Sequence, residues 1–242
     1  MEKLVYLLWG PTPKNADDTR RLLLEDVAPR LLKLDPRGLQ INVDDADSSV
    51  PAPVPVPESE LPLLAQVSLW LDAHDYRAPY EAILAEVGVR RAGYLVSEAL
   101  YTDYGRNENH PAPRDWPDGK RSPGVLTVAL VQKPPHFEYE NWYGHWYGHQ
   151  SPMSQWTQPR MRYVRNTITR RLTPGAPPYD GIVEEGWPSR GHVSDPHLFY
   201  NSGGSDEKLR EHARIMMDSV THMFDLTKLR SFTLSEYLLK TV

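Results

Sequence analysis

Cysteine is missing from all 242 residues of the chain. This absence excludes disulfides, thiolate metal sites and a cysteine nucleophile, and it agrees with a reducing compartment such as the cytoplasm. Positive charge is also scarce, since the net charge is -5 at pH 7. Beyond the short groups at 160–162 and 170–171 the sequence has no basic stripe, which argues against a nucleic-acid partner.

Long apolar runs are absent as well. No run approaches the roughly 20 residues needed to span a bilayer, and residues 1–9 lack the apolar region and cleavage site of a signal peptide. The sequence therefore predicts a soluble, cytoplasmic protein without a membrane span. It also lacks a phosphate loop, a dinucleotide glycine pattern and a Gly-x-Ser-x-Gly elbow, so nucleotide-dependent chemistry and serine hydrolysis are not expected.

The first 104 residues show a β-α-β-β-α-β order of apolar patterns. Pro36 is predicted to end the first helix and Gly88 the second. Residues 44–62 are crowded with Asp, Ser and Pro, which indicates an exposed, partly extended loop. The expected elements are a strand at 3–9, a helix at 15–34, strands at 39–44 and 65–71, a helix at 80–87 and a strand at 91–101.

The same order returns after residues 105–122, a polar, proline-rich segment that is predicted to be a linker. In the second half, residues 123–242, the helix at 209–224 has a clear apolar face. The expected elements are a strand at 125–131, a helix at 137–150, strands at 162–168 and 181–185, a helix at 209–224 and a strand at 231–239.

The two halves share a local echo, because Ser97-Glu98 and Ser235-Glu236 both stand inside the last strand of their half. With the repeated element order, this predicts an α+β fold of two fused ferredoxin-like repeats, 1–104 and 123–242, that form one α+β barrel of the dimeric type. The sheet of each repeat has an open face that must be covered. We therefore expect the two sheets to pack against each other, with the pocket in the space between them.

One segment combines aromatic rings with groups that can carry protons. If residues 137–150 form a helix, Trp142, His145, Trp146 and His149 fall at i, i+3, i+4 and i+7, on a single face. Such a face suits the wall of a small-molecule cavity better than a plain core. The first helix of the first half has no Trp or His, so that half is predicted to be degenerate and any site single.

The sequence from Trp146 to His149, continued by Gln-Ser-Pro-Met, and the sequence Arg162-Tyr-Val-Arg-Asn166 resemble the EthD-domain family of dimeric α+β barrel proteins. The resemblance covers about residues 123–240. It implies a small, largely apolar ligand. Some members are linked to ether degradation, and fungal members act in dehydration or decarboxylation of aromatic polyketides. The family commonly separates its Trp and His by three residues, whereas two separate Trp146 from His149, so Trp142 or His145 could take a counterpart's place.

His149 is the leading candidate for an acid/base, since an imidazole titrates near neutrality; the alternative is a histidine that caps the helix end before Ser151-Pro152. His145 is either a second pocket residue or a surface residue. The two histidines are four apart, the spacing that can place two imidazoles on one metal. No glutamate lies between them and no third ligand is evident, so no metal is predicted.

The remaining candidates are expected to bind the substrate. Trp142, Trp146 and Tyr163 would shape the cavity. Asn166 could hold a substrate carbonyl or only satisfy a strand edge, and Arg162 could bind a carboxylate or enolate or belong to a salt-bridged surface. Two mid-strand carboxylates, Glu98 and Glu236, are predicted to pair with arginines, because an unpaired charge there is costly.

The sequence thus predicts a lyase or isomerase that needs no cofactor and acts on an oxygenated, apolar or aromatic small molecule, with a histidine that moves the proton. The alternative is a non-catalytic binding or accessory protein. The sequence leaves open whether two such chains form a homodimer.

Overall fold

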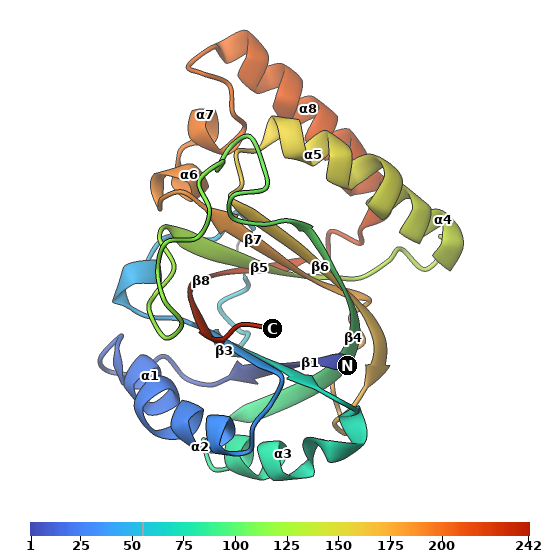
Figure 1. Cartoon of the computed structure of the whole chain (residues 1–242). Helices are drawn as coiled ribbons and strands as arrows, with labels where there is room; N and C mark the ends of the chain where they lie inside the picture. Colours follow the sequence, from blue (N-terminus) through green and yellow to red (C-terminus); the bar gives the residue numbers. More distant parts are fainter. Residues whose placement is uncertain (55) are drawn as a thin grey trace.

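The computed structural model of the chain describes residues 1–54 and 56–242. Its centre is a closed antiparallel barrel of eight strands with helices on two opposite sides (Figure 1). The predicted α+β class and barrel are confirmed. The strands are β1 (Glu2–Trp9), β2 (Gly38–Val43), β3 (Leu63–Leu71), β4 (Arg90–Thr102), β5 (Val125–Val131), β6 (Arg162–Arg171), β7 (Gly181–Trp187) and β8 (Arg230–Lys240).

Two of the helical stretches are long and are interrupted by π-helical turns. The first runs through α1 (Asp18–Arg21), η1 (Leu22–Val27) and α2 (Ala28–Lys33), and the second through α4 (Tyr139–His145), η4 (Trp146–Gln150) and α5 (Ser151–Thr157). The remaining helices are η2 (Ala46–Ser48), η3 (His74–Arg77), α3 (Ala78–Ala85), α6 (Gly191–Ser194), α7 (Pro196–Phe199) and α8 (Asp206–Met223).

Each half of the chain contributes four neighbouring strands to the barrel. The order around it is β1-β3-β2-β8-β5-β7-β6-β4, so the halves meet where β2 pairs with β8 and where β4 pairs with β6. Helices α1 to α3 cover the outside of the first half, and α4, α5 and α8 cover the second (Figure 1). The division into domains at 1–104 and 123–242, and its origin by duplication, stay predictions.

Closure of the barrel buries both faces of its strands. The alternation in β2 predicts one buried face, yet all six of its residues are buried. Leu39 and Ile41 face outward and pack in one cluster with Leu23 and Leu31 of the covering helices. The side chain of Gln40 points inward instead and donates to carboxylates of the opposite half. The polar positions of this strand therefore face the barrel interior and not solvent.

The interior is apolar at one end and ionic at the other. Val5, Leu7, Val128 and Ile182 belong to the apolar cluster. Buried side chains thus occupy the space in which the sequence predicts the pocket, and the ligand-sized cavity lies outside the barrel, as described below. The physical reason is that eight strands leave an interior just wide enough for side chains to fill.

Glu184 of β7 is the centre of the ionic end and is completely buried. Lys3 Nζ donates to its Oε1 at 3.1 Å, and Arg162 Nη1 lies 3.7 Å from its Oε2. The side-chain amides of Gln40, Gln66 and Asn166 donate to the same carboxylate at 2.8 to 3.0 Å. Five side chains from four other strands therefore converge on one charge.

The network continues to the mouth of the barrel through Glu236. Arg162 Nη1 donates to Glu236 Oε1 at 3.0 Å, as the predicted pairing of this glutamate with an arginine requires. Glu98 differs, because its partner is Lys3 at 2.9 Å. Ser122, at the end of the predicted linker, donates to Glu236 at 2.6 Å. The 105–122 segment is thus joined to the barrel by hydrogen bonds.

Among the described residues, no helix is long and apolar enough to cross a membrane.

We expect Glu184→Ala to lower the free energy of unfolding by about 3–5 kcal/mol, because it leaves Lys3 and Arg162 buried with one fewer counter-charge. Urea denaturation measures the effect. Asp218→Ala is the matched control: its pair with Arg214 is about two-thirds exposed, so the loss there should stay below about 1 kcal/mol. Equal losses for the two variants would contradict the central role of Glu184.

The same carboxylate should make stability depend on pH. Burial works to raise the pKa of Glu184, but the charges of Lys3 and Arg162 and the hydrogen bonds to it prevail and lower the pKa from 4.5 to about 2. The ionised group therefore stabilises the fold above pH 4.5, and this contribution disappears as the pH falls towards 2. The difference in urea midpoint between the wild type and Glu184→Gln should become smaller as the pH falls from 4.5 towards 2. A difference that does not change over this range would show that Glu184 is not the group that titrates.

Candidate functional site

The aromatic helix lies on the outer face of the second-half sheet (Figure 1). The helix predicted over 137–150 is present, but the predicted range ends too early, because the helical chain continues to Thr157. The π-helical turn explains this: the N–H of Ser151 bonds to the carbonyl of Trp146, five residues back, and this wider turn lets the helix pass Pro152. His149 therefore lies inside a helix and does not cap its end.

The predicted single face of tryptophans and histidines divides in two. Trp142 and Trp146 are fully buried against the sheet, whereas His145 is half-buried and His149 is exposed. The ring of His145 turns towards α8, with Nε2 2.9 Å from Ser219 Oγ. Burial lowers the pKa of His145, and the neighbouring His149 adds to the effect. The sheet covers only the tryptophan side of the helix, so the histidines meet α8 and solvent.

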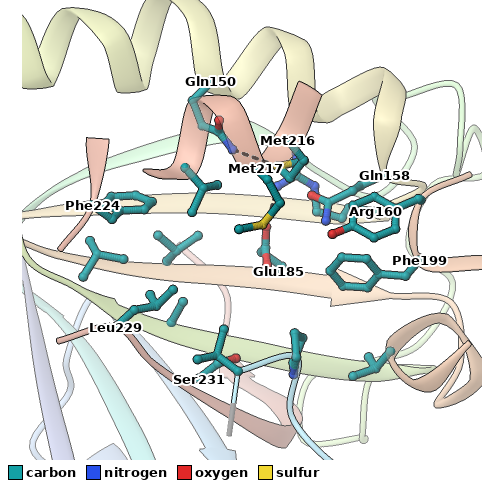
Figure 2. Close-up of a pocket in the computed structure, with 18 of the residues that line it drawn as sticks. Gln150, Gln158, Arg160, Glu185, Phe199, Met216, Met217, Phe224, Leu229 and Ser231 are labelled. Atoms are coloured by element: carbon teal, nitrogen blue, oxygen red, sulfur yellow. Dashed lines mark hydrogen bonds and ion pairs between the residues drawn. The ribbon is translucent and has the colours of Figure 1, made fainter. Parts of the chain in front are cut away.

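A cavity of about 330 Å³ lies between this sheet and the helices that cover it. Gln150 of η4 reaches it from the helix above and Glu185 of β7 from the strand below (Figure 2), and Trp146 of η4 and Tyr163 of β6 also belong to its lining. Met216 of α8 also contributes. Further apolar wall residues are Val131, Val183, Phe199, Val220, Phe224 and Leu229. The cavity is therefore a mainly apolar space with a few polar groups.

An ion pair stands in the cavity wall. Arg160 Nη1 donates to Glu185 Oε1 at 2.5 Å, and the Arg160 side chain is 1% exposed while that of Glu185 is 18% exposed. Thr127 Oγ1 lies 3.2 Å from the other carboxylate oxygen. Arg160 Nη2 donates to Ser154 at 2.6 Å, and the guanidinium carbon lies 3.9 Å from the ring centre of Tyr163. The pair is thus fixed by its surroundings and open to the cavity through Glu185.

Arg160 also keeps a buried Nε–H that has no acceptor among the described residues. A buried donor without a partner is rare in proteins and calls for an explanation. This atom has no accessible surface, so it does not face the cavity. The pair is open to a small molecule through the carboxylate of Glu185, which is 18% exposed.

Of the residues predicted to bind or convert a substrate, the cavity lining contains Trp146 and Tyr163. Trp146 Nε1 donates to the hydroxyl of Tyr163 at 3.2 Å, so the two act as one wall. Trp142 packs beside Trp146, with ring centres 5.1 Å apart, but is not part of the lining. His145 and His149 are not part of this lining either, and their predicted acid/base role stays a prediction.

The other two predicted substrate residues lie inside the barrel. Asn166 donates to Glu184 at 2.8 Å and to the carbonyl of Ile182 at 3.2 Å. Arg162 contacts Glu236 and Glu184 and is 6% exposed. Successive side chains of a strand point to opposite faces, so Tyr163 faces the cavity while these neighbours in β6 face the interior. Arg162 and Asn166 therefore lie outside this cavity, and their substrate-binding roles stay predictions.

Sequence reasoning missed Gln150, Arg160 and Glu185. For Glu185 a signal was present: Glu184 and Glu185 are adjacent in a strand, so one of the two must leave the face that the other occupies. Gln150 and Arg160 gave no local signal, because they stand among residues that are common on helix and strand surfaces.

In the first half, the described residues under the covering helices are packed differently. The space under α1 to α3 is filled by a cluster that includes Leu23, Val27, Leu31 and Leu84, all almost completely buried. A hollow of about 340 Å³ lies at the edge of this layer, beside Asp35, Arg37 and Tyr76, and the single, asymmetric site stays a prediction.

No protein-family model matches the chain, and no curated protein does. Solved structures are similar in fold. An anthrone oxidase-like protein has 10% identity and a TM-score of 0.53, with 99% of this chain and 94% of that chain covered. A monooxygenase-like protein from Fusobacterium nucleatum has 9% identity and a TM-score of 0.51, with 99% and 92% covered. Both likenesses agree with the eight-stranded barrel described above and, at such identity, concern the fold alone.

A third structure, a chlorite dismutase variant from Candidatus Nitrospira defluvii, has 9% identity and a TM-score of 0.48, with 99% of this chain and 92% of that chain covered. The strand order and the first two structures together define the chain as an α+β barrel protein of the dimeric type, with both halves of the barrel in one chain.

We expect Gly181→Ala to disturb the cavity wall. A Cβ atom there would lie 2.7 Å from Cη2 of Trp146 and 3.0 Å from Cγ2 of Val131, so the indole must move, at a cost of about 1–3 kcal/mol. Urea denaturation followed by tryptophan fluorescence measures both the cost and the movement. Gly144→Ala is the control, because it has open space and lies in a helix, where alanine should stabilise by about 0.5–1 kcal/mol.

Proposed function

We propose that the protein is a lyase or isomerase that needs no cofactor and acts on an apolar, oxygenated small molecule bound in the cavity beside Trp146. The observation that carries this proposal is the Arg160–Glu185 pair, which is set in an otherwise apolar wall and open to the cavity. Small-molecule sites typically combine such walls with a few fixed polar groups and have volumes of about 300–1,000 Å³. The cavity lies at the lower end of that range.

The pair suits removal of a proton beside a carbonyl group. Glu185 accepts the proton from the substrate carbon, and the electron pair left behind forms an enolate. The positive charge of the Arg160 guanidinium, beside Glu185 in the cavity wall, stabilises the negative charge on the enolate oxygen. Glu185 then returns the proton, either to another carbon in an isomerisation or to a departing hydroxyl in a dehydration that releases water.

Glu185 takes the place that the sequence suggests for His149. An acid/base must come within hydrogen-bond reach of the proton that it moves, and His149 is exposed on a helix side outside the cavity lining. Membership of the EthD-domain family is part of this proposal and is supported by the cavity positions of Trp146 and Tyr163. A cytoplasmic location and pairing into a homodimer are predictions carried over from the sequence.

The alternative is a binding or accessory protein that holds the same kind of molecule for a partner enzyme. A specific observation favours it: each oxygen of Glu185 already accepts a hydrogen bond, one from Arg160 and one from Thr127. A carboxylate held in this way can recognise a ligand without moving protons.

We expect Glu185→Gln to reduce turnover by about 100-fold or more, the contribution of a positioned general base, while His149→Ala keeps activity within about twofold because it lies outside the cavity lining. Deuterium uptake from heavy water into a panel of aromatic ketones, followed by NMR, measures the proton transfer. Thermal unfolding of each variant controls for loss of fold.

Two results separate the proposals. Undiminished exchange by Glu185→Gln would rule out Glu185 as the base, and a loss confined to His149→Ala would restore the histidine. Tight binding of panel members that quench tryptophan fluorescence, with no exchange by the wild type, would favour the binding protein.

A further inference from the structure

Three of the nine histidines of the chain lie together where α8 runs beside the helix that leads from α4 to α5 (Figure 1). The ring centre of His145 in α4 lies 4.8 Å from that of His149 in η4 and 5.1 Å from that of His222 in α8. His145 is half-buried and the other two are exposed. The sequence places the first two in one segment, and the tertiary structure adds the third.

His145 is directed at α8. Its Nε2 lies 2.9 Å from Oγ of Ser219, which stands in α8 three residues before His222. The ring of His222 packs edge-on against Phe137, with 4.9 Å between the ring centres and an angle of 90° between the planes. The two imidazoles of His145 and His222 are therefore presented by two different helices at the same place.

The spacing of these two rings fits one shared metal ion. Imidazole nitrogens bind transition metals at about 2.0–2.1 Å, which sets the ring centres of two ligands roughly 4.5–5.2 Å apart for angles between about 90° and 109°. The distance of 5.1 Å between His145 and His222 lies within this interval. Imidazole suits zinc, copper and nickel, whereas magnesium and calcium prefer oxygen ligands.

The surroundings keep His145 in the form that a metal requires. A metal binds the neutral imidazole, and burial together with the neighbouring His149 and His222 lowers the pKa of His145. With the rings as they stand, no group of three or more ligating side chains in the described part of the chain could hold an ion. The two imidazoles would therefore share the ion with water.

Such an ion would join two helices that cover the cavity. The residue that follows His145, Trp146, belongs to the cavity lining, and so does Val220 of α8. His145 and His222 themselves are not part of that lining. A metal held between them would thus fix the two helices relative to each other from outside the cavity.

We propose that His145 and His222 form a binding site for a divalent transition-metal ion, Zn²⁺, Ni²⁺ or Cu²⁺, which cross-links α4 to α8. The ion takes no part in the proton transfer proposed for Glu185. Its binding can be measured whether or not the protein is an enzyme.

Calorimetric titration of the full-length chain, without a histidine tag, with ZnCl₂ and with NiCl₂ measures the Kd and the stoichiometry. We expect one ion per chain and no binding of MgCl₂. His145→Ala and His222→Ala should each weaken binding at least about tenfold, since even the loss of an outer-shell partner of a metal ligand costs about 10–100-fold in affinity. His149→Ala is the matched control and should bind the ion almost as tightly as the wild type.

Hydrogen exchange tests the cross-link. Zn²⁺ should slow amide exchange in residues 139–157 and in residues 206–223 of the wild type, because the ion opposes local opening of both helices. The same ion should protect neither helix of His222→Ala. Because His222 is exposed, this variant should unfold thermally at the same temperature as the wild type when no metal is present.

Three results would overturn the inference. Loss of binding in His149→Ala but not in His222→Ala would place the ion on one helix and refute the cross-link. Weak binding of several ions that none of the three substitutions reduces would show adventitious binding to scattered histidines only. No binding of millimolar Zn²⁺ or Ni²⁺ would refute the site. Each of these results leaves the proposed function at Arg160 and Glu185 unaffected.

Discussion

The burial of Glu184 is the constraint on which the rest of the structure depends. A closed barrel buries both faces of its strands, so each polar side chain that points inward must find its partner inside. Glu184 supplies one charge that satisfies Lys3, Gln40, Gln66 and Asn166 at once. Three of these residues come from the first half of the chain and one from the second. The carboxylate therefore joins the halves, and its loss would leave buried charges and amides unpaired.

The candidate site follows from the next residue in the same strand. Successive side chains of β7 point to opposite faces, so Glu185 points to the outer face when Glu184 points into the barrel. There the covering helices leave a cavity, and Arg160 joins Glu185 in its wall. The structural role and the proposed chemical role are thus carried by adjacent glutamates on opposite faces of one sheet, and the rigid barrel fixes the position of both.

Both halves of the chain contain a π-helical segment, but its side chains have different roles in the two halves. In each, a π-helical segment is followed closely by a proline: η1 by Pro29 and η4 by Pro152. In the first half the segment carries Leu23 and Val27, which fill the space above the sheet. In the second it carries Trp146 and Gln150, which leave a cavity. Side-chain size and polarity, on a similar local backbone, decide which half can hold a ligand.

The sequence by itself determined the order of strands and helices, the α+β barrel class, the aromatic helix and the pairing of Glu236 with an arginine, because apolar periodicity and the cost of a buried charge are local properties. It also singled out Trp146 and Tyr163, which the structure places in the lining of a cavity outside the barrel and not between the sheets as predicted. Only the tertiary structure decided the rest. Periodicity shows that Arg162 and Tyr163 face opposite ways but not which face lies inside a closed barrel. Contacts between distant residues, such as Lys3 with Glu184, decide which face lies inside. As a result, Arg162 points into the barrel and Glu185 faces the cavity. His149, on the covering helix, is exposed to solvent.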